Sequence, residues 1–141
     1  MKAISLYQPW ASLWCGGPKI HETRHWYTPV RGWIAVHAAK RREKIDHFDS
    51  LSIVCDRAFG DCWRSDLPYG AIIGMVEIED VYSTWKDGES QHEDEDDLIC
   101  GDFSPGRYVW RRGNFVKFTT PVPFAGKQSW FDVPTSIAIA P

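Results

Sequence analysis

The chain has no long apolar run and no export signal. None of its 141 residues lies in an apolar stretch approaching the roughly 20 residues that a membrane-spanning helix needs. The N-terminal residues Met1 to Ser5 lack the apolar core and cleavage site of a secretion signal. We therefore expect a cytoplasmic protein with no membrane partner, and at this length a single domain over residues 1–141.

Cysteine is scarce and irregularly spaced. Cys15, Cys55, Cys62 and Cys100 form no CxxC pair and no zinc-ribbon spacing. Because no export signal is present, reduced thiols explain these residues better than disulfides do. We expect free, mostly buried thiols, no structural metal and no cofactor.

The motifs of several enzyme classes are missing as well. There is no phosphate-binding glycine loop, no HExxH and no Ser/His/Asp series. Nothing in the order of the chain couples a cysteine to a histidine, so a cysteine nucleophile is unsupported. His37 lies beside Trp33 and Ala35 on a predicted strand, where a lone histidine is more often a core residue than a catalyst.

The net charge of −3 is unevenly spread. Residues 1–66 carry 10 Lys and Arg against 7 Asp and Glu, whereas residues 67–141 carry 6 against 12. An acidic protein has no general attraction to phosphate backbones, so any nucleic-acid contact requires a local basic surface. The strongest basic run is Lys40, Arg41, Arg42 and Lys44, which is either a phosphate-contacting surface or a solvated face.

Local patterns predict a mixture of helices and strands. Pro9 and the spacing of apolar residues predict a helix over residues 8–15, ended by Gly16-Gly17-Pro18. A longer helix is expected over residues 40–60, with an apolar stripe that includes Phe48. Strands are expected over residues 33–38, 71–81, 107–112 and 115–120, the last two joined by a hairpin turn at Gly113-Asn114. Residues 87–97, seven of them acidic, are expected to form a solvated loop.

The densest polar cluster runs from Lys19 to Trp26. In an extended chain, Glu22 and Arg24 share one side with Ile20 and Trp26, so we expect all four to face inward. Two opposite charges on the inner side either form a structural ion pair or hold a polar ligand by bidentate contacts. The two interpretations do not exclude each other.

Several stretches together resemble the ASCH family of the PUA-like superfamily. They are residues 5–11 (SLYQPWA), 17–24 (GPKIHETR), 32–38 (GWIAVHA), 70–76 (GAIIGMV) and 106–110 (GRYVW). The resemblance runs from about Ile4 to Val133. It implies an α+β fold, a PUA-like (ASCH) β-barrel of mixed strands with flanking helices, and a cleft beside the GxKxxExR segment.

The resemblance also implies a ligand class. The family is generally regarded as binding RNA or modified nucleotides, so we expect RNA, another nucleic acid or a modified nucleoside as the partner. The cleft residues carried over are Gln8, Trp10, Lys19, Glu22 and Arg24. To these we add two further candidate ligand contacts, Trp26 and Arg107.

A catalytic role is left open. Some small members resemble amidohydrolases that deacetylate acetylcytidine with a Lys, a Thr three residues later and a distant Glu. Lys19 matches this pattern, but the position three residues on is Glu22, and Thr23 is one place late. If the protein is an enzyme, an amidohydrolase of this type or a nuclease, Lys19 and Glu22 are the candidate catalytic residues. A protein-interaction domain is the remaining alternative.

Overall fold

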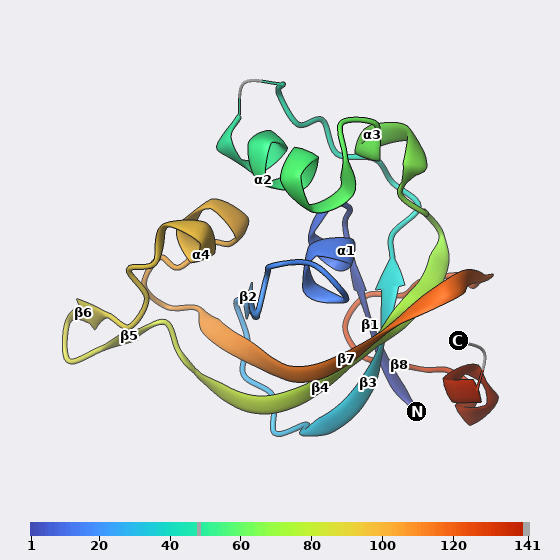
Figure 1. Ribbon diagram of the computed structural model, residues 1–141. Helices are drawn as coiled ribbons and strands as arrows, with labels where there is room; N and C mark the ends of the chain where they lie inside the picture. The colour runs from blue at the N-terminus through green and yellow to red at the C-terminus, as the bar shows by residue number, and fades with distance from the viewer. Residues whose placement is uncertain (48, 140–141) are drawn as a thin grey trace.

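A strongly bent sheet of six strands organises the chain (Figure 1). The structure is a computed structural model and describes residues 1–47 and 49–139. The strand order is β2-β7-β4-β3-β1-β8, with neighbours antiparallel except for the parallel pair of β1 and β3. The strands are β1 (Lys2–Leu6), β2 (His21–Arg24), β3 (Gly32–Ala38), β4 (Ala71–Ser83), β7 (Tyr108–Pro123) and β8 (Phe131–Asp132).

The sheet is open, so the predicted barrel is wrong, whereas the predicted α+β class is confirmed. The edge strands β2 and β8 do not pair with each other in the described part of the chain. They hold only 4 and 2 residues, and closing a barrel requires edge strands that pair along a common length. Instead β4 and β7 bend together into a trough that holds α1 (Trp10–Trp14) (Figure 1).

The predicted hairpin at Gly113-Asn114 is also wrong. β7 is one strand of 16 residues that pairs with β4 from Tyr108 to Pro123. Between the pairs Ile78–Arg112 and Val76–Phe115, β7 contains one residue more than β4, which defines a β-bulge. The Gly-Asn dipeptide, which suits tight turns, therefore occupies a bulge in a continuous strand.

The predicted helix over residues 40–60 begins later than expected. The helix α2 spans Ser50–Phe59, because the Asp49 side chain accepts a hydrogen bond from the Leu51 amide at 2.8 Å and caps its start. Residues 40–47 are irregular, so the basic run does not lie at a helix start, and Phe48 lies outside the described residues. A short helix, α3 (Trp63–Asp66), follows. Within the described chain, no helix has both the length and the apolar character needed to span a membrane.

The acidic segment is more ordered than the predicted loop. The strands β5 (Trp85–Lys86) and β6 (Glu89–Ser90) form a small hairpin around Asp87 and Gly88, which both have positive φ as a tight hairpin turn requires. The helix α4 (Glu95–Cys100) follows, capped by the Asp94 side chain. Acidic residues in its first turn are favourable near the positive end of a helix.

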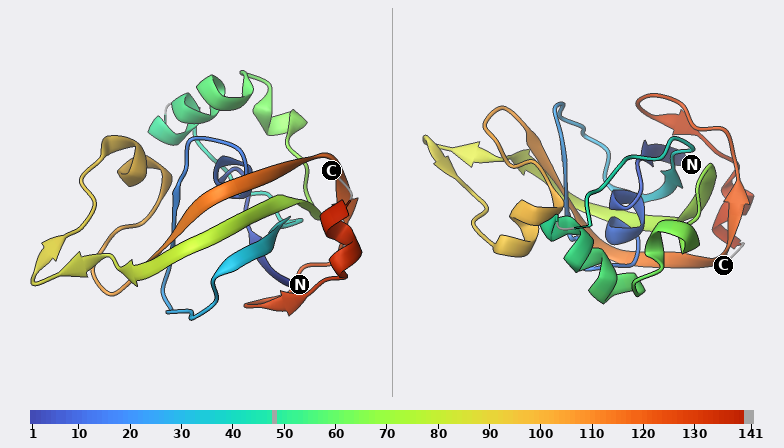
Figure 2. Two further views of the ribbon diagram at one scale, coloured as in Figure 1. Left: turned by 60° about the horizontal axis from the view of Figure 1, so that its bottom comes forward. Right: turned by 90° about the horizontal axis from the view of Figure 1, so that it is seen from above.

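The buried side chains form three clusters on and around the sheet. The largest lies between the sheet and α1 and contains Trp14 and Trp110. A second covers the other face, where Phe131 and the C-terminal 3-10 helix η1 (Thr135–Ile139) pack. The third joins α1 and α2 to Cys100 at the end of α4. The β5–β6 hairpin and η1 lie at opposite ends of the long strands (Figure 2).

Candidate functional site

The segment that links α1 to β2 is held in place by a buried arginine. Arg112 of β7 donates to the Gly17 carbonyl at 2.8 Å and, through Nε, to the Lys19 carbonyl at 3.1 Å. Gly17 is required there because an added Cβ would lie 2.9 Å from the Cα of Leu13. Burial lowers the pKa of Arg112, which remains a cation at neutral pH. The Lys19 backbone therefore has a fixed position at the start of β2.

Lys19 and Glu22 form a buried ion pair. Lys19 Nζ lies 3.0 Å from Glu22 Oε1, and the two side chains are 1% and 8% exposed. The ammonium also donates to the Cys100 carbonyl at 2.7 Å, and Glu22 Oε1 also accepts from the Thr23 amide at 2.9 Å. The predicted proximity of Lys19 and Glu22 is thus observed, on the inner side of β2.

The end of α4 and the residues after it form a wall opposite β2. The Asp102 amide donates to Thr23 Oγ1 at 3.2 Å, and Arg107 donates to the carbonyls of Asp102 and Thr23 at 3.0 and 3.2 Å. Hydrogen bonds from Ser104 lower the pKa of Asp102, so this carboxylate is ionised at neutral pH. Segments about eighty residues apart in sequence are therefore fastened together around Lys19.

Arg24, at the end of β2, has unused donors. Its guanidinium lies 5.9 Å from the ring of Trp26 and 6.0 Å from that of Trp110, but it makes no hydrogen bond to any residue in the described ranges. Burial lowers the pKa of Arg24, an effect that Glu22 opposes and Arg107 reinforces. A half-buried cation with free N–H groups is suited to binding an acceptor from outside the protein.

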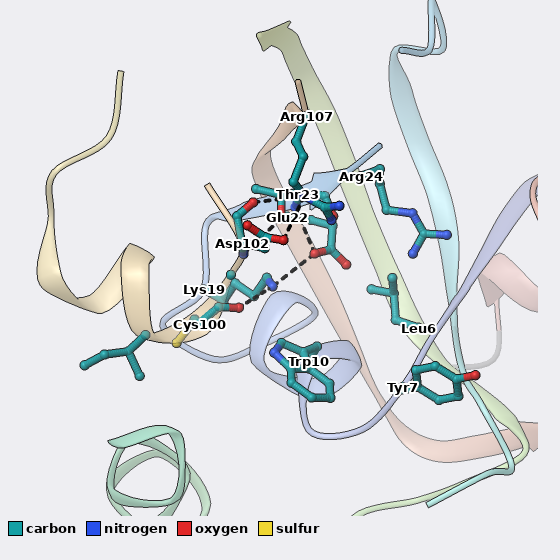
Figure 3. A pocket seen from close by; sticks show the side chains of 12 residues that line it. Leu6, Tyr7, Trp10, Lys19, Glu22, Thr23, Arg24, Cys100, Asp102 and Arg107 are labelled. Atoms are coloured by element: carbon teal, nitrogen blue, oxygen red, sulfur yellow. Dashed lines mark hydrogen bonds and ion pairs between the residues drawn. The ribbon is translucent and has the colours of Figure 1, made fainter. Parts of the chain in front are cut away.

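These side chains surround a cavity of about 360 Å³, called the cleft below (Figure 3). Lys19, Glu22 and Arg24 all line it, as the polar cluster predicted. The remaining lining residues are Leu6, Tyr7, Trp10, Thr23, Ile99, Cys100, Gly101, Asp102 and Arg107. The prediction that Ile20 faces inward is wrong: its side chain is 41% exposed, because the regular alternation of β2 begins only at His21.

Three further hollows continue from the cleft. The first, about 590 Å³, shares Leu6, Tyr7 and Arg24 with it. The next, about 730 Å³, shares Tyr7 and Lys127 with the first, and the last, about 610 Å³, adjoins it at Tyr69. Cationic side chains line this series, here called the basic track: Lys127, Lys40, Arg41, Arg42, Lys44 and Arg64. Glu43 and Asp46 are the carboxylates among its lining residues.

The predicted contact residues thus fall into three groups. Trp10, Lys19, Glu22, Arg24 and Arg107 line the cleft. The run of Lys40, Arg41, Arg42 and Lys44 lines the far hollows, with Arg42 also lying 3.8 Å above the Tyr69 ring.

Two predicted contacts lie elsewhere. Trp26 lines the neighbouring hollow and packs edge-on against Trp110. Gln8 is not among the residues that line the cleft. Its amide donates to Ser12 Oγ at 2.7 Å and to the Pro68 carbonyl at 2.9 Å, so it is engaged in holding α1.

Other residues of the site were not predicted. Asp102 and the Cys100 carbonyl come from a distant segment with no motif, and only the three-dimensional fold places them near Lys19. Arg112 was noted only as part of a basic group. Tyr7 is different, because it stands inside the SLYQPWA stretch and its 43% exposure makes its ring available to a ligand.

Comparisons with known proteins agree with this architecture. Residues 4–117 match the ASCH domain family. Over 82 residues, 57% of this chain, the sequence is 34% identical to mouse and, in a like alignment, 33% identical to human activating signal cointegrator 1. The chain spans 14% of the length of each of these relatives. Crystal structures of ASCH from Zymomonas mobilis and of a point variant have TM-scores of 0.56 and 0.55 at 13% identity, covering 96% and 95% of this chain and 88% and 90% of theirs.

Proposed function

The chain belongs to the ASCH domain family, and on that premise we propose that it binds single-stranded RNA by taking one unpaired nucleotide into the cleft. The observation that carries this proposal is the buried Lys19–Glu22 pair lining a cavity of about 360 Å³ that opens onto the basic track. A cavity of this size lies within the range of small-ligand sites. RNA-binding proteins commonly read unstacked bases in this way.

The cleft offers groups that complement a nucleobase. Glu22 Oε1 is occupied by Lys19 and Thr23, whereas Oε2 makes no hydrogen bond within the described part of the chain. Arg24 supplies free donors beside it. A base edge carries both donors and acceptors, and the rings of Tyr7 and Trp10 provide surfaces on which a base can stack.

Stability alone does not explain the buried pair. Removing two charges from water costs several kcal/mol per ion by order of magnitude, and apolar residues of similar volume are often equally stabilising. A pair that lines a cavity, with one carboxylate oxygen free, is better accounted for by recognition of a polar ligand.

The basic track supplies the attraction that the acidic protein lacks overall. Lys40, Arg41 and Lys44 are exposed, and their hollows connect with the cleft through Tyr7 and Lys127. Phosphates of the nucleotides flanking the bound base would lie along these cations. Such contacts contribute affinity without sequence preference.

Two sets of variants test the proposal by fluorescence anisotropy with labelled single-stranded RNA. Arg24→Ala and Glu22→Gln should each weaken binding by about 1–3 kcal/mol, the range for a lost charged hydrogen bond. The triple variant of Lys40, Arg41 and Lys44 to Ala should lower the slope of log K against log salt by about 2, because each phosphate contact to a single strand contributes about 0.7.

A matched triple variant controls for charge. Lys2, Arg57 and Lys86 are exposed and line none of the four hollows, so replacing them with Ala should leave the salt slope almost unchanged. Equal losses in both triple variants would reject the track. Unchanged affinity in Arg24→Ala and Glu22→Gln would reject the cleft.

A second candidate function, hydrolysis of an acetylated cytidine, is favoured by one observation: Thr23 lines the cleft together with Lys19 and Glu22. Two contacts weigh against it. The Lys19 ammonium donates to two oxygens, which favours its charged form over a base with a free lone pair, and Thr23 Oγ1 is engaged by the Asp102 amide. We expect no more than weak release of acetate from acetylcytidine. Turnover of about 1 s⁻¹ that Lys19→Ala abolishes in a folded protein would make the hydrolase the primary function.

A further inference from the structure

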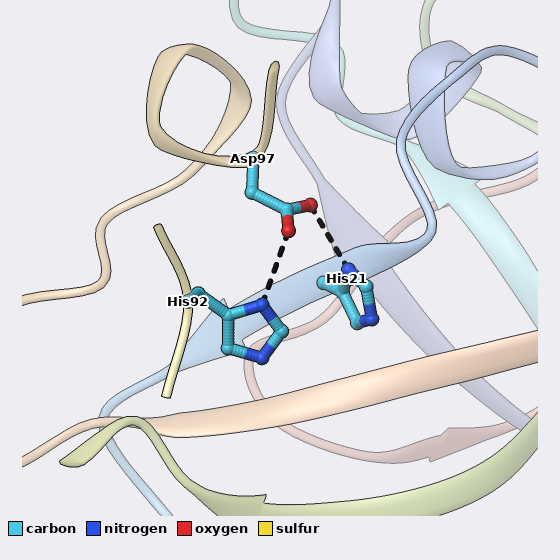
Figure 4. A group of neighbouring side chains, drawn as sticks. All are labelled: His21, His92 and Asp97. Atoms are coloured by element: carbon cyan, nitrogen blue, oxygen red, sulfur yellow. Dashed lines mark hydrogen bonds and ion pairs between the residues drawn. The ribbon is translucent and has the colours of Figure 1, made fainter. Parts of the chain in front are cut away.

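A second cluster of chemically active side chains lies behind the α4 wall of the cleft. It consists of His21, the first residue of β2, His92, in the connection after β6, and Asp97 in α4 (Figure 4). Both imidazoles face the same carboxylate. His21 Nδ1 lies 2.9 Å from Asp97 Oδ1, and His92 Nδ1 lies 3.1 Å from Asp97 Oδ2. One ligating atom from each of the three residues lies within 4.8 Å of the others.

We propose that His21, His92 and Asp97 bind a divalent late transition-metal ion of the zinc class. Tetrahedral coordination with bonds of about 2.0–2.2 Å places ligand atoms about 3.3–3.6 Å apart. The observed separations bracket this spacing, so small rotations of the side chains complete the site. Two imidazoles and one carboxylate suit zinc, whereas magnesium and calcium take oxygen ligands.

The surroundings of the cluster support metal binding. His92 Nε2 lies 2.6 Å from the Tyr82 hydroxyl, and the two rings stack with an interplanar angle of 12°. An outer partner of this kind fixes the orientation of a metal-binding imidazole and leaves Nδ1 for the metal. The side chains of His21, His92 and Asp97 are 17%, 9% and 16% exposed, which leaves an approach for the ion and room for water as a fourth ligand.

The local charge acts in the same direction. The exposed residues Glu93 to Asp96 immediately precede Asp97 along the chain and give this end of the protein a negative field. A metal ion here would join α4 to β2. Because α4 ends at Cys100, whose carbonyl contacts Lys19, the ion would brace the wall of the cleft without entering it.

The test uses the full chain, free of any histidine tag and stripped with a chelator, titrated with Zn²⁺ in competition with a chromogenic chelator. We expect one equivalent to bind. His92→Ala and Asp97→Asn should each weaken binding at least about 100-fold, since even outer partners are worth about 10–100-fold. Tyr82→Phe should fall in that smaller range. His25→Ala, an exposed histidine just beyond β2, is the matched control and should bind as the original chain does.

Each outcome decides the proposal. Absence of one-to-one binding, or equal zinc affinity in the original chain and in folded His92→Ala, would show that the cluster is only a hydrogen-bonded network and would overturn the assignment. If His92→Ala does not fold, His21→Asn and Tyr82→Phe give the same comparison. RNA binding is measured separately, so failure of the metal site leaves the proposed cleft function unaffected.

Discussion

Breaking the buried Lys19–Glu22 pair from one side should cost far more than replacing both residues. In Lys19→Met the Glu22 carboxylate stays beneath the surface with only the Thr23 amide as a donor. In Glu22→Gln the amide oxygen keeps a hydrogen bond to Lys19, but the ammonium loses its compensating charge. The double variant, Lys19→Met with Glu22→Gln, removes both charges while roughly preserving volume.

The magnitudes follow from the burial of the two side chains, which are 1% and 8% exposed. An uncompensated buried charge costs about 3–5 kcal/mol, which we expect for Lys19→Met. Glu22→Gln should cost about 1–3 kcal/mol because one hydrogen bond survives. The double variant should return to within about 1 kcal/mol of the original protein, since apolar replacement of buried ion pairs is often neutral.

Urea unfolding followed by tryptophan fluorescence measures the free energies, and anisotropy with single-stranded RNA measures binding by the same proteins. We expect stability to recover in the double variant while RNA affinity does not. Single variants that each lose less than about 0.5 kcal/mol, the level of an ordinary surface change, would show that the pair is not desolvated. Recovery of both stability and binding would refute the assignment of the pair to recognition.

Three further outcomes are expected. Cys62 is exposed and should be the first thiol to react with a disulfide reagent, whereas burial raises the pKa of Cys15 to about 12 and should leave it unreactive until unfolding; Cys62→Ser should remove the early phase. Burial lowers the pKa of His37, so the unfolded chain takes up a proton first: stability should fall as pH drops below about 6.5 and level off below the folded-state pKa, and His37→Asn should flatten this dependence in thermal melts. Arg112→Met, which removes the donors to the Gly17 and Lys19 carbonyls, should cost about 2–4 kcal/mol in urea unfolding and weaken RNA binding; an unchanged affinity would show that the segment keeps its shape without Arg112.

The part of the site that sequence reasoning found is local in the chain. Lys19, Glu22 and Arg24 lie within one short stretch, where strand alternation and the stop at Gly16-Gly17-Pro18 constrain their directions. The same reasoning placed Ile20 on the wrong side, because it assumed regular alternation before the strand begins. Local rules therefore gave the cluster but not its starting register.

Features that depend on distant partners were not accessible in this way. Gly113-Asn114 is compatible with a turn and with a bulge, and only the length of β4 opposite it decides for the bulge. The closure of the sheet likewise depends on how many residues β2 and β8 contribute at its edges. The contact between Lys19 and Cys100 joins residues separated by 81 positions, with no periodicity to announce it.

The separation between Lys19 and Cys100 has a consequence for how such domains diversify. Residues 84–107 leave the sheet after β4 and return at β7, and they supply the cleft with Ile99, Cys100, Gly101, Asp102 and Arg107. β4 and β7 pair along their whole length without help from this excursion. The excursion is therefore an exchangeable cassette: its sequence can drift, or be replaced by grafting, and so alter ligand preference while the scaffold and the Lys19–Glu22 pair stay constant.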